Sequence, residues 1–144
     1  MEQMTKSGKI LHEIIDPENM KPINYLASPY SLGNDSSQEQ RNLRYYQVTR
    51  QAWQLFASGI NVYSPITHWH NIIKVFPIEM TPSQWLMVDF PYLKASEKLY
   101  VLMLEHWNKS VGVLNEINFA KFNNIEIEYI EPTPYVLYGE DIVT

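Results

Sequence analysis

Leu99-Tyr-Val-Leu-Met-Leu104 is the stretch that decides the fold, because it holds six apolar residues with no polar interruption. A short, continuously apolar run of this kind is typical of a strand that is buried on both faces, as in the centre of a parallel sheet. Parallel strands are joined by crossover connections, which are usually helices. The sequence on both sides of this run is therefore expected to alternate between short strands and helices.

That alternation is present along the chain. Further short apolar runs, each expected to be a strand, occupy residues 23–27, 60–64 and 125–130. Helices with N-cap signals are expected between the strands: from Ser36 to Gly59, with a capping box of Ser36 and Glu39, and over residues 81–93 and 110–123. Residues 66–80 show no strong periodicity and are expected to form a long connection. The order predicts an α/β fold with a mostly parallel sheet and helices on both faces.

Length and composition limit the class of protein. A chain of 144 residues is expected to form one domain, here residues 23–144, preceded by a polar extension over residues 1–22. The absence of cysteine excludes disulfides, thiolate zinc sites and cysteine nucleophiles, so any nucleophile is oxygen or nitrogen. A net charge of −5 argues against a nucleic acid polymer as partner. With neither a membrane-length apolar run nor a signal peptide, we expect a cytoplasmic protein without a membrane partner.

Candidate functional residues are expected where the strands of a parallel sheet end, since ligands bind there. Glu116 lies four residues from both Gly112 and Ala120, which places a carboxylate between small neighbours on one helical face. Ser110 and Gly112 begin the same helix, where free backbone N–H groups favour an anion. A solvated surface glutamate and an ordinary serine cap are the alternative interpretations, and spacing alone leaves them open.

Two further groups of polar residues have a less specific pattern. His68 and His70 are alternate residues, and in an extended segment their imidazoles would converge, which suits a substrate contact better than a metal site that lacks a third ligand. Arg41 and Arg44 lie near the start of the first predicted helix and are candidates for contact with an anion, unless they lie on a solvated helix face. No glycine pattern supports a dinucleotide or triphosphate site, and we expect neither a cofactor nor a metal.

Taken together, five short motifs in order resemble the nucleoside 2-deoxyribosyltransferase superfamily, and most closely its DUF1937 branch. The motifs are Tyr25-Leu-Ala-Ser-Pro-Tyr-Ser31, Arg41, Ser64-Pro-Ile-Thr-His68-Trp-His70, Trp85 with Asp89, and Ser110-Val-Gly112 with Glu116 and Ala120. The resemblance covers about residues 23–130. It implies a flavodoxin-like (Rossmann-like), doubly wound sheet of four to five strands and an enzyme that acts on the N-glycosidic bond of nucleosides or nucleoside 5′-monophosphates.

The resemblance also implies roles for particular residues. Glu116 matches the family's nucleophile, Tyr25 the tyrosine that orients it, and Asp89 the aspartate that contacts or protonates the leaving base. Contacts to the substrate are expected from Ser28, Tyr30, Arg41, His68, His70, Ser110 and Gly112, the serine and glycine of the last helix holding a phosphate. Family members are generally oligomers, so a homodimer or a higher homo-oligomer is expected.

Several activities fit this resemblance. Glu97 stands where transferases often carry an aspartate, which favours hydrolysis of the glycosidic bond over exchange between two bases. Cleavage of the nicotinamide–ribose bond of NAD requires similar chemistry but a longer pocket. Two alternatives are not enzymes: a module that senses a nucleotide without turning it over, and a structural subunit with a vestigial site.

Overall fold

The computed structural model describes residues 2–4, 10–12, 16–32 and 37–133. Its elements in chain order are β1 (Glu2–Met4), β2 (Ile10–His12), the 3-10 turn η1 (Pro17–Asn19), β3 (Asn24–Ala27), α1 (Gln38–Ala57), β4 (Val62–Tyr63), α2 (Pro65–Val75), α3 (Pro82–Lys94), β5 (Lys98–Leu102), the 3-10 turn η2 (Trp107–Lys109), α4 (Val111–Phe122) and β6 (Glu126–Ile130). In the part of the chain that is described, no helix combines the length and the apolar character needed to cross a membrane.

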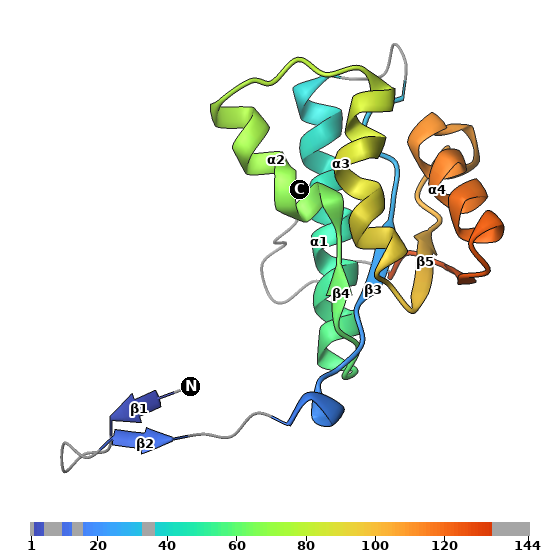
Figure 1. Cartoon of the computed structure of the whole chain (residues 1–144). Helices are drawn as coiled ribbons and strands as arrows, with labels where there is room; N and C mark the ends of the chain where they lie inside the picture. Colours follow the sequence, from blue (N-terminus) through green and yellow to red (C-terminus); the bar gives the residue numbers. More distant parts are fainter. Residues whose placement is uncertain (1, 5–9, 13–15, 33–36, 134–144) are drawn as a thin grey trace.

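Four of the strands form one parallel sheet in the order β4-β3-β5-β6, and β1 and β2 pair separately as an antiparallel ribbon (Figure 1). The predicted α/β class with a parallel sheet of four strands is confirmed, and the arrangement is that of a flavodoxin-like or Rossmann-like fold. Strand order reverses between β3 and β5, since the chain first moves outward from β3 to β4 and then returns to β5 on the other side. Such a switch point opens a crevice at the carboxyl ends of the two strands.

The core has two halves because side chains alternate across the sheet. Leu99 and Val101 of β5 face the half that α3 and α4 cover, whereas Tyr100 and Leu102 face the half that α1 covers. Leu99, Val101 and Leu102 are completely buried. Burial of each such side chain contributes about 1.5–3 kcal/mol. The apolar run at residues 99–104 is therefore the central strand, as predicted, and its regular structure ends at Leu102.

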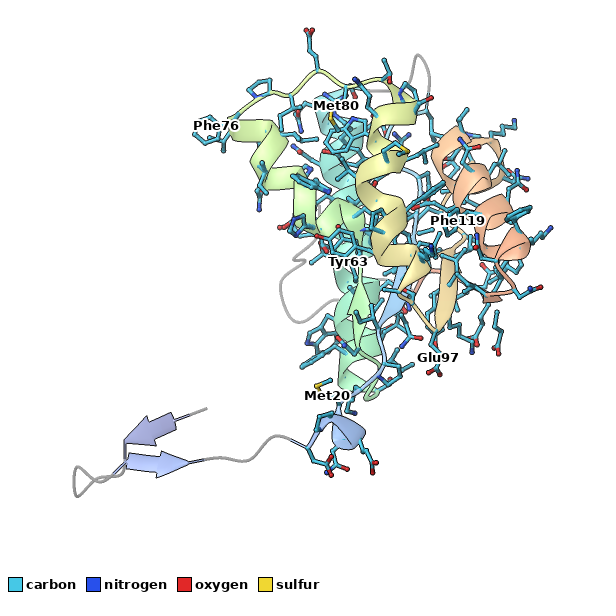
Figure 2. All side chains as sticks on the ribbon, viewed as in Figure 1. Met20, Tyr63, Phe76, Met80, Glu97 and Phe119 are labelled. Atoms are coloured by element: carbon cyan, nitrogen blue, oxygen red, sulfur yellow. The ribbon has the colours of Figure 1, made fainter. Side chains whose placement is uncertain are left out.

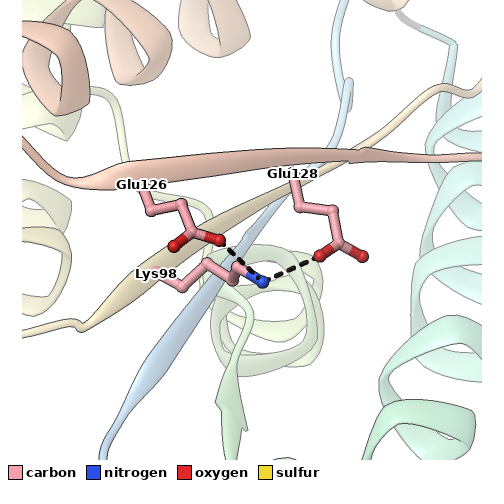
Figure 3. A network of polar contacts seen from close by, with 3 residues as sticks. All are labelled: Lys98, Glu126 and Glu128. Carbon is pink, nitrogen blue, oxygen red and sulfur yellow. Dashed lines mark hydrogen bonds and ion pairs between the residues drawn. The ribbon is translucent and has the colours of Figure 1, made fainter.

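An ion-pair network joins β5 to the edge strand β6 (Figure 3). The Nζ atom of Lys98 lies 2.9 Å from Glu126 and 2.8 Å from Glu128, and these two carboxylates are on alternate residues of one strand. Both glutamates are exposed, so solvent weakens the attraction. The network lies at the amino end of β5 and therefore away from the crevice.

Two local predictions are wrong. Residues 65–75, expected to belong to a loop connection, form α2, which Ser64 caps by accepting a hydrogen bond from the backbone N–H of Thr67 at 3.2 Å. Only Ile66 and His70 of this helix are buried, so polar and aromatic residues obscure its periodicity. The cap of α1 is Ser37, which accepts from the N–H of Gln40 at 3.1 Å, and the predicted cap Ser36 lies outside the described residues.

Candidate active site

A cavity of about 670 Å³ opens at the carboxyl edge of the sheet, where the switch point lies. Its wall combines the segment after β3 with α2, α3 and the beginning of α4. Most of the residues that the sequence pointed to line it: Ser28, Tyr30, Arg41, His70, Asp89, Ser110, Gly112 and Glu116. Tyr25 lies behind this wall in the core, and His68 is on the surface.

Glu116 projects from the second turn of α4 and is buried, with 7% of its surface exposed. The hydroxyl of Tyr25, a fully buried residue of β3, donates a short hydrogen bond to its Oε2 atom. Burial raises the pKa of Glu116 to about 8, the Tyr25 hydrogen bond opposes that rise, and the charge of Asp89 adds to it. The interpretation of Glu116 as a solvated surface residue is therefore wrong. Gly112, one turn earlier, lines the cavity beside it, whereas Ala120 belongs to the core.

Asp89 reaches the same cavity from α3, and burial raises its pKa to about 6. The indole N–H of Trp69 lowers that pKa, although it forms no hydrogen bond of good geometry with the carboxylate. With one carboxyl group titrating near 6 and the other near 8, Asp89 and Glu116 hold about one proton between them at neutral pH. One acid and one carboxylate can therefore face a ligand together.

The beginning of α4 provides a place for an anion. Ser110 is the N-cap and is 4% exposed, and its Oγ accepts from the N–H of Val113 at 3.3 Å. Free N–H groups of the first turn and the positive end of the helix dipole lie at this end of α4, which borders the cavity. Ser28, after the neighbouring strand β3, also lines the cavity, and its buried Oγ has no hydrogen-bond partner among the described residues.

His70 is a buried member of the cavity wall and is 3% exposed. Its Nδ1 lies 2.7 Å from the hydroxyl of Tyr30, and its ring stacks on Tyr45 with 4.0 Å between centroids. Burial, and then the charges of Lys74 and Arg41, lower the pKa of His70, so its imidazole is neutral at pH 7. His70 thus orders the wall beside Tyr30.

The two arginines considered for an anion contact have different environments. Arg41 lines the cavity, and its Nη2 donates to Gln38 Oε1 at 3.3 Å. Arg44 is buried outside the cavity wall, where its Nη1 donates to the backbone carbonyl of Tyr30 at 2.7 Å. Arg44 therefore holds the segment after β3 in place, and Arg41 is the one that faces the cavity.

The predicted convergence of His68 and His70 is wrong. The segment is helical, so residues two apart point about 200° away from each other around the axis. His70 is buried and His68 is exposed, with its ring against Trp69 at 4.7 Å. Within the described residues, no three histidine, aspartate or glutamate side chains are grouped as metal ligands. Glu97 is also remote, because it precedes β5 at the amino edge of the sheet, where it lines a second, polar pocket.

The wall contains two tryptophans that stand in the sequence motifs but to which no role was given. Trp69 and Trp85, from α2 and α3, line the cavity with their rings 5.7 Å apart and inclined by 67°. Tyr63, behind the wall, lies 5.8 Å from Tyr25 between ring centroids. Tryptophan and tyrosine are ordinary core residues, and only the position of Trp69 between two histidines distinguished it.

The chain matches a known protein family. The family described as "Domain of unknown function (DUF1937)" matches residues 22–131, which include every element from β3 to β6 and the whole cavity wall. No curated protein matches the chain.

The raised pKa of Glu116 predicts a loss of stability at alkaline pH. Glu116 binds its proton more tightly when folded, with a pKa of about 8 against 4.5 for an ordinary glutamate. Its stabilising contribution is therefore complete below pH 4.5 and is lost as the pH rises through about 8. Between pH 7 and 9 the free energy of unfolding, measured with urea, should fall by about 1 kcal/mol more in the wild type than in Glu116→Gln.

The matched control is Glu105→Gln, which removes a carboxylate from an exposed position. This variant should keep the wild-type pH dependence. If the free energy of unfolding fell equally in the wild type and in Glu116→Gln between pH 7 and 9, that would contradict the raised pKa of Glu116.

Proposed function

This chain is a member of the DUF1937 family, and we propose that it is an N-glycosidase that hydrolyses the bond between base and sugar in a nucleoside 5′-monophosphate. The single observation that carries the proposal is the pair of carboxyl groups, buried Glu116 and half-buried Asp89, on two walls of one cavity. The resemblance of the surrounding motifs to the nucleoside 2-deoxyribosyltransferase superfamily supports the same chemistry.

Glu116 is the nucleophile in this proposal. Its carboxylate attacks the anomeric carbon of the sugar, an ester bond forms, and the electron pair of the breaking C–N bond leaves with the base. In the free site the proton shared by the pair lies mainly on Glu116, whose pKa is the higher of the two. In this proposal the proton passes to Asp89 when the substrate binds, which leaves Glu116 as the carboxylate, and Asp89 gives it to the leaving base. Water then attacks the anomeric carbon, and its proton returns to Asp89 as the ester breaks and Glu116 becomes a carboxylate again.

Tyr25 supports the ionised state of the nucleophile. Burial raises the pKa of Glu116, whereas a hydroxyl that donates to Oε2 lowers it and so makes the carboxylate easier to form. The same bond fixes the rotation of the carboxyl group, so that its other oxygen can be directed at the sugar. A nucleophile held in one orientation reacts faster because little freedom is lost at the transition state.

The phosphate of the substrate is assigned to the beginning of α4. Ser110 and Gly112 lie one to two turns before Glu116 on the same helix, so a phosphate bound there would hold the sugar over the carboxylate. Arg41 lies across the cavity and adds a positive charge. Such a contact, remote from the reacting bond, improves transition-state binding.

The base is assigned to the aromatic side of the cavity. Trp69 and Trp85 offer flat faces there, and Asp89 lies on the same helix as Trp85. Exchange onto a second base in place of water, and binding of an intact nucleotide without turnover, are the alternatives. Tight binding of an intact nucleotide in calorimetry, with no product formed over hours, would favour the binding module. The expected homo-oligomer stays a prediction.

Release of free base is the direct test of the proposed activity. The wild type should release base from at least one member of a panel of ribo- and deoxyribonucleoside monophosphates, followed by chromatography. Glu116→Gln should lose about 1,000-fold or more in kcat, because it removes the nucleophile. The rate should be greatest between about pH 6 and 8, where the two carboxyl groups share one proton.

Glu105→Gln serves again as the control and should keep the wild-type rate. If wild type and Glu116→Gln release base equally, or if neither acts on any member of the panel, the assignment is wrong. Product that carries a second added base would favour transfer over hydrolysis.

The phosphate assignment has its own test. Arg41→Ala should raise KM for the monophosphate by about 10-fold or more, because a charged hydrogen bond is lost, and should leave KM for the free nucleoside unchanged. Arg50→Ala is the matched control, since Arg50 lies on the same helix but does not line the cavity. An equal effect of Arg41→Ala on nucleotide and nucleoside would contradict a phosphate contact.

A further inference from the structure

Tyr63 stands at the carboxyl end of β4, beside Tyr25 in the parallel register, and does not belong to the cavity wall (Figure 2). Its ring stacks on Tyr92 of α3, with centroids 4.1 Å apart and planes inclined by 6°. On another side its ring meets that of Tyr25 at 5.8 Å. Because the ring is fixed between two neighbours, the position of its hydroxyl is fixed as well.

Three buried polar atoms of Tyr63 and of two residues in the cavity wall lack a partner in the described part of the chain. The hydroxyl oxygen of Tyr63, Nε1 of Trp69 and Oδ1 of Asp89 are all inaccessible to solvent, and none has a hydrogen-bond partner within the described residues. They nevertheless influence one another. Burial and then the charge of Asp89 raise the pKa of Tyr63, while the N–H of Trp69 lowers the pKa of both. Two donors and one acceptor thus lie close enough to interact.

We propose that Tyr63 is a positioning residue for Asp89: its hydroxyl, together with the N–H of Trp69, holds Oδ1 of the Asp89 carboxyl group from behind the cavity. Unpaired polar atoms are costly in a buried environment, and a small movement of this carboxyl group satisfies all three. Asp89 lines the cavity while its Oδ1 is buried, so the other oxygen is the one that faces a ligand.

This inference rests on the proposed function, in which Asp89 protonates the leaving base, and it adds a reason why that acid operates near neutral pH. Burial alone drives the pKa of a carboxyl group upward, and donors to the carboxylate hold it down. An acid works best when its pKa lies near the working pH. The titratable groups that interact with the charge of Asp89 are Tyr25 of β3, Tyr63 of β4 and Glu116 of α4. The rings of His68 of α2 and Tyr92 of α3 lie against Tyr63, at 5.8 and 4.1 Å between centroids.

Removal of the single hydroxyl tests the role of Tyr63. Tyr63→Phe keeps the ring and its stack on Tyr92, and it should raise the pKa of Asp89 by about one pH unit, measured by carbon NMR of the labelled aspartate carboxyl group. The matched control is Tyr92→Phe, which removes a hydroxyl from the other ring of the same stack and should leave the pKa of Asp89 unchanged. A merely structural role would affect the two variants alike.

Equal pKa values for Asp89 in wild type and Tyr63→Phe would overturn the proposal. This titration needs no substrate, so it can fail or succeed independently of the proposed function. If Tyr63→Phe does not fold, the wild type decides: the hydroxyl proton of Tyr63 should exchange slowly and its resonance should move as Asp89 titrates. If the chemical shift of the Tyr63 hydroxyl proton did not change as Asp89 titrates, the proposal would be overturned just as clearly.

Discussion

The hydrogen bond from Tyr25 to Glu116 is the interaction on which the site depends. It joins β3, which like β5 is an interior strand, to α4 inside the apolar core, where a carboxyl group without a partner is strongly disfavoured. The bond is possible because β3 and β5 are neighbours at the switch point, so that the helix after β5 packs over β3. The fold therefore builds the site: the topology that buries residues 99–102 also brings Glu116 to the hydroxyl of Tyr25.

The electrostatics of the cavity follow from this burial. Glu116 and Asp89 both have raised pKa values, mainly because solvent is excluded from them, and they divide about one proton near neutral pH. Positive character comes from the beginning of α4 and from Arg41. The cavity is therefore polarised although the chain as a whole carries a net charge of −5. That polarity suits a small ligand with a phosphate at one end and a bond that breaks to a cation at the other.

The fold and half of the site could be predicted from the sequence. Uninterrupted apolar runs and serine or threonine caps identify strands and helices directly, and the motif from Tyr25 to Ser31 and the spacing from Ser110 to Glu116 identified residues that do line or support the cavity. The helix over residues 65–75 could not be predicted because only two of its residues are buried, so it shows no apolar periodicity. Without that helix, the opposite directions of His68 and His70 could not be predicted either. Trp69 and Trp85 stand in the motifs but could not be given a role, and Tyr63 was not singled out, because an aromatic residue in or behind a site has the same local signature as one that fills a core.

Chemical capture of the nucleophile tests the central claim most directly. Wild-type protein mixed with a nucleotide on which it acts, quenched in acid within milliseconds and digested, is examined by mass spectrometry for a sugar attached to the protein. We expect one sugar phosphate in ester linkage on the peptide that contains Glu116, and none in Glu116→Gln. Turnover with no adduct on Glu116, or an adduct on a different residue, would contradict it.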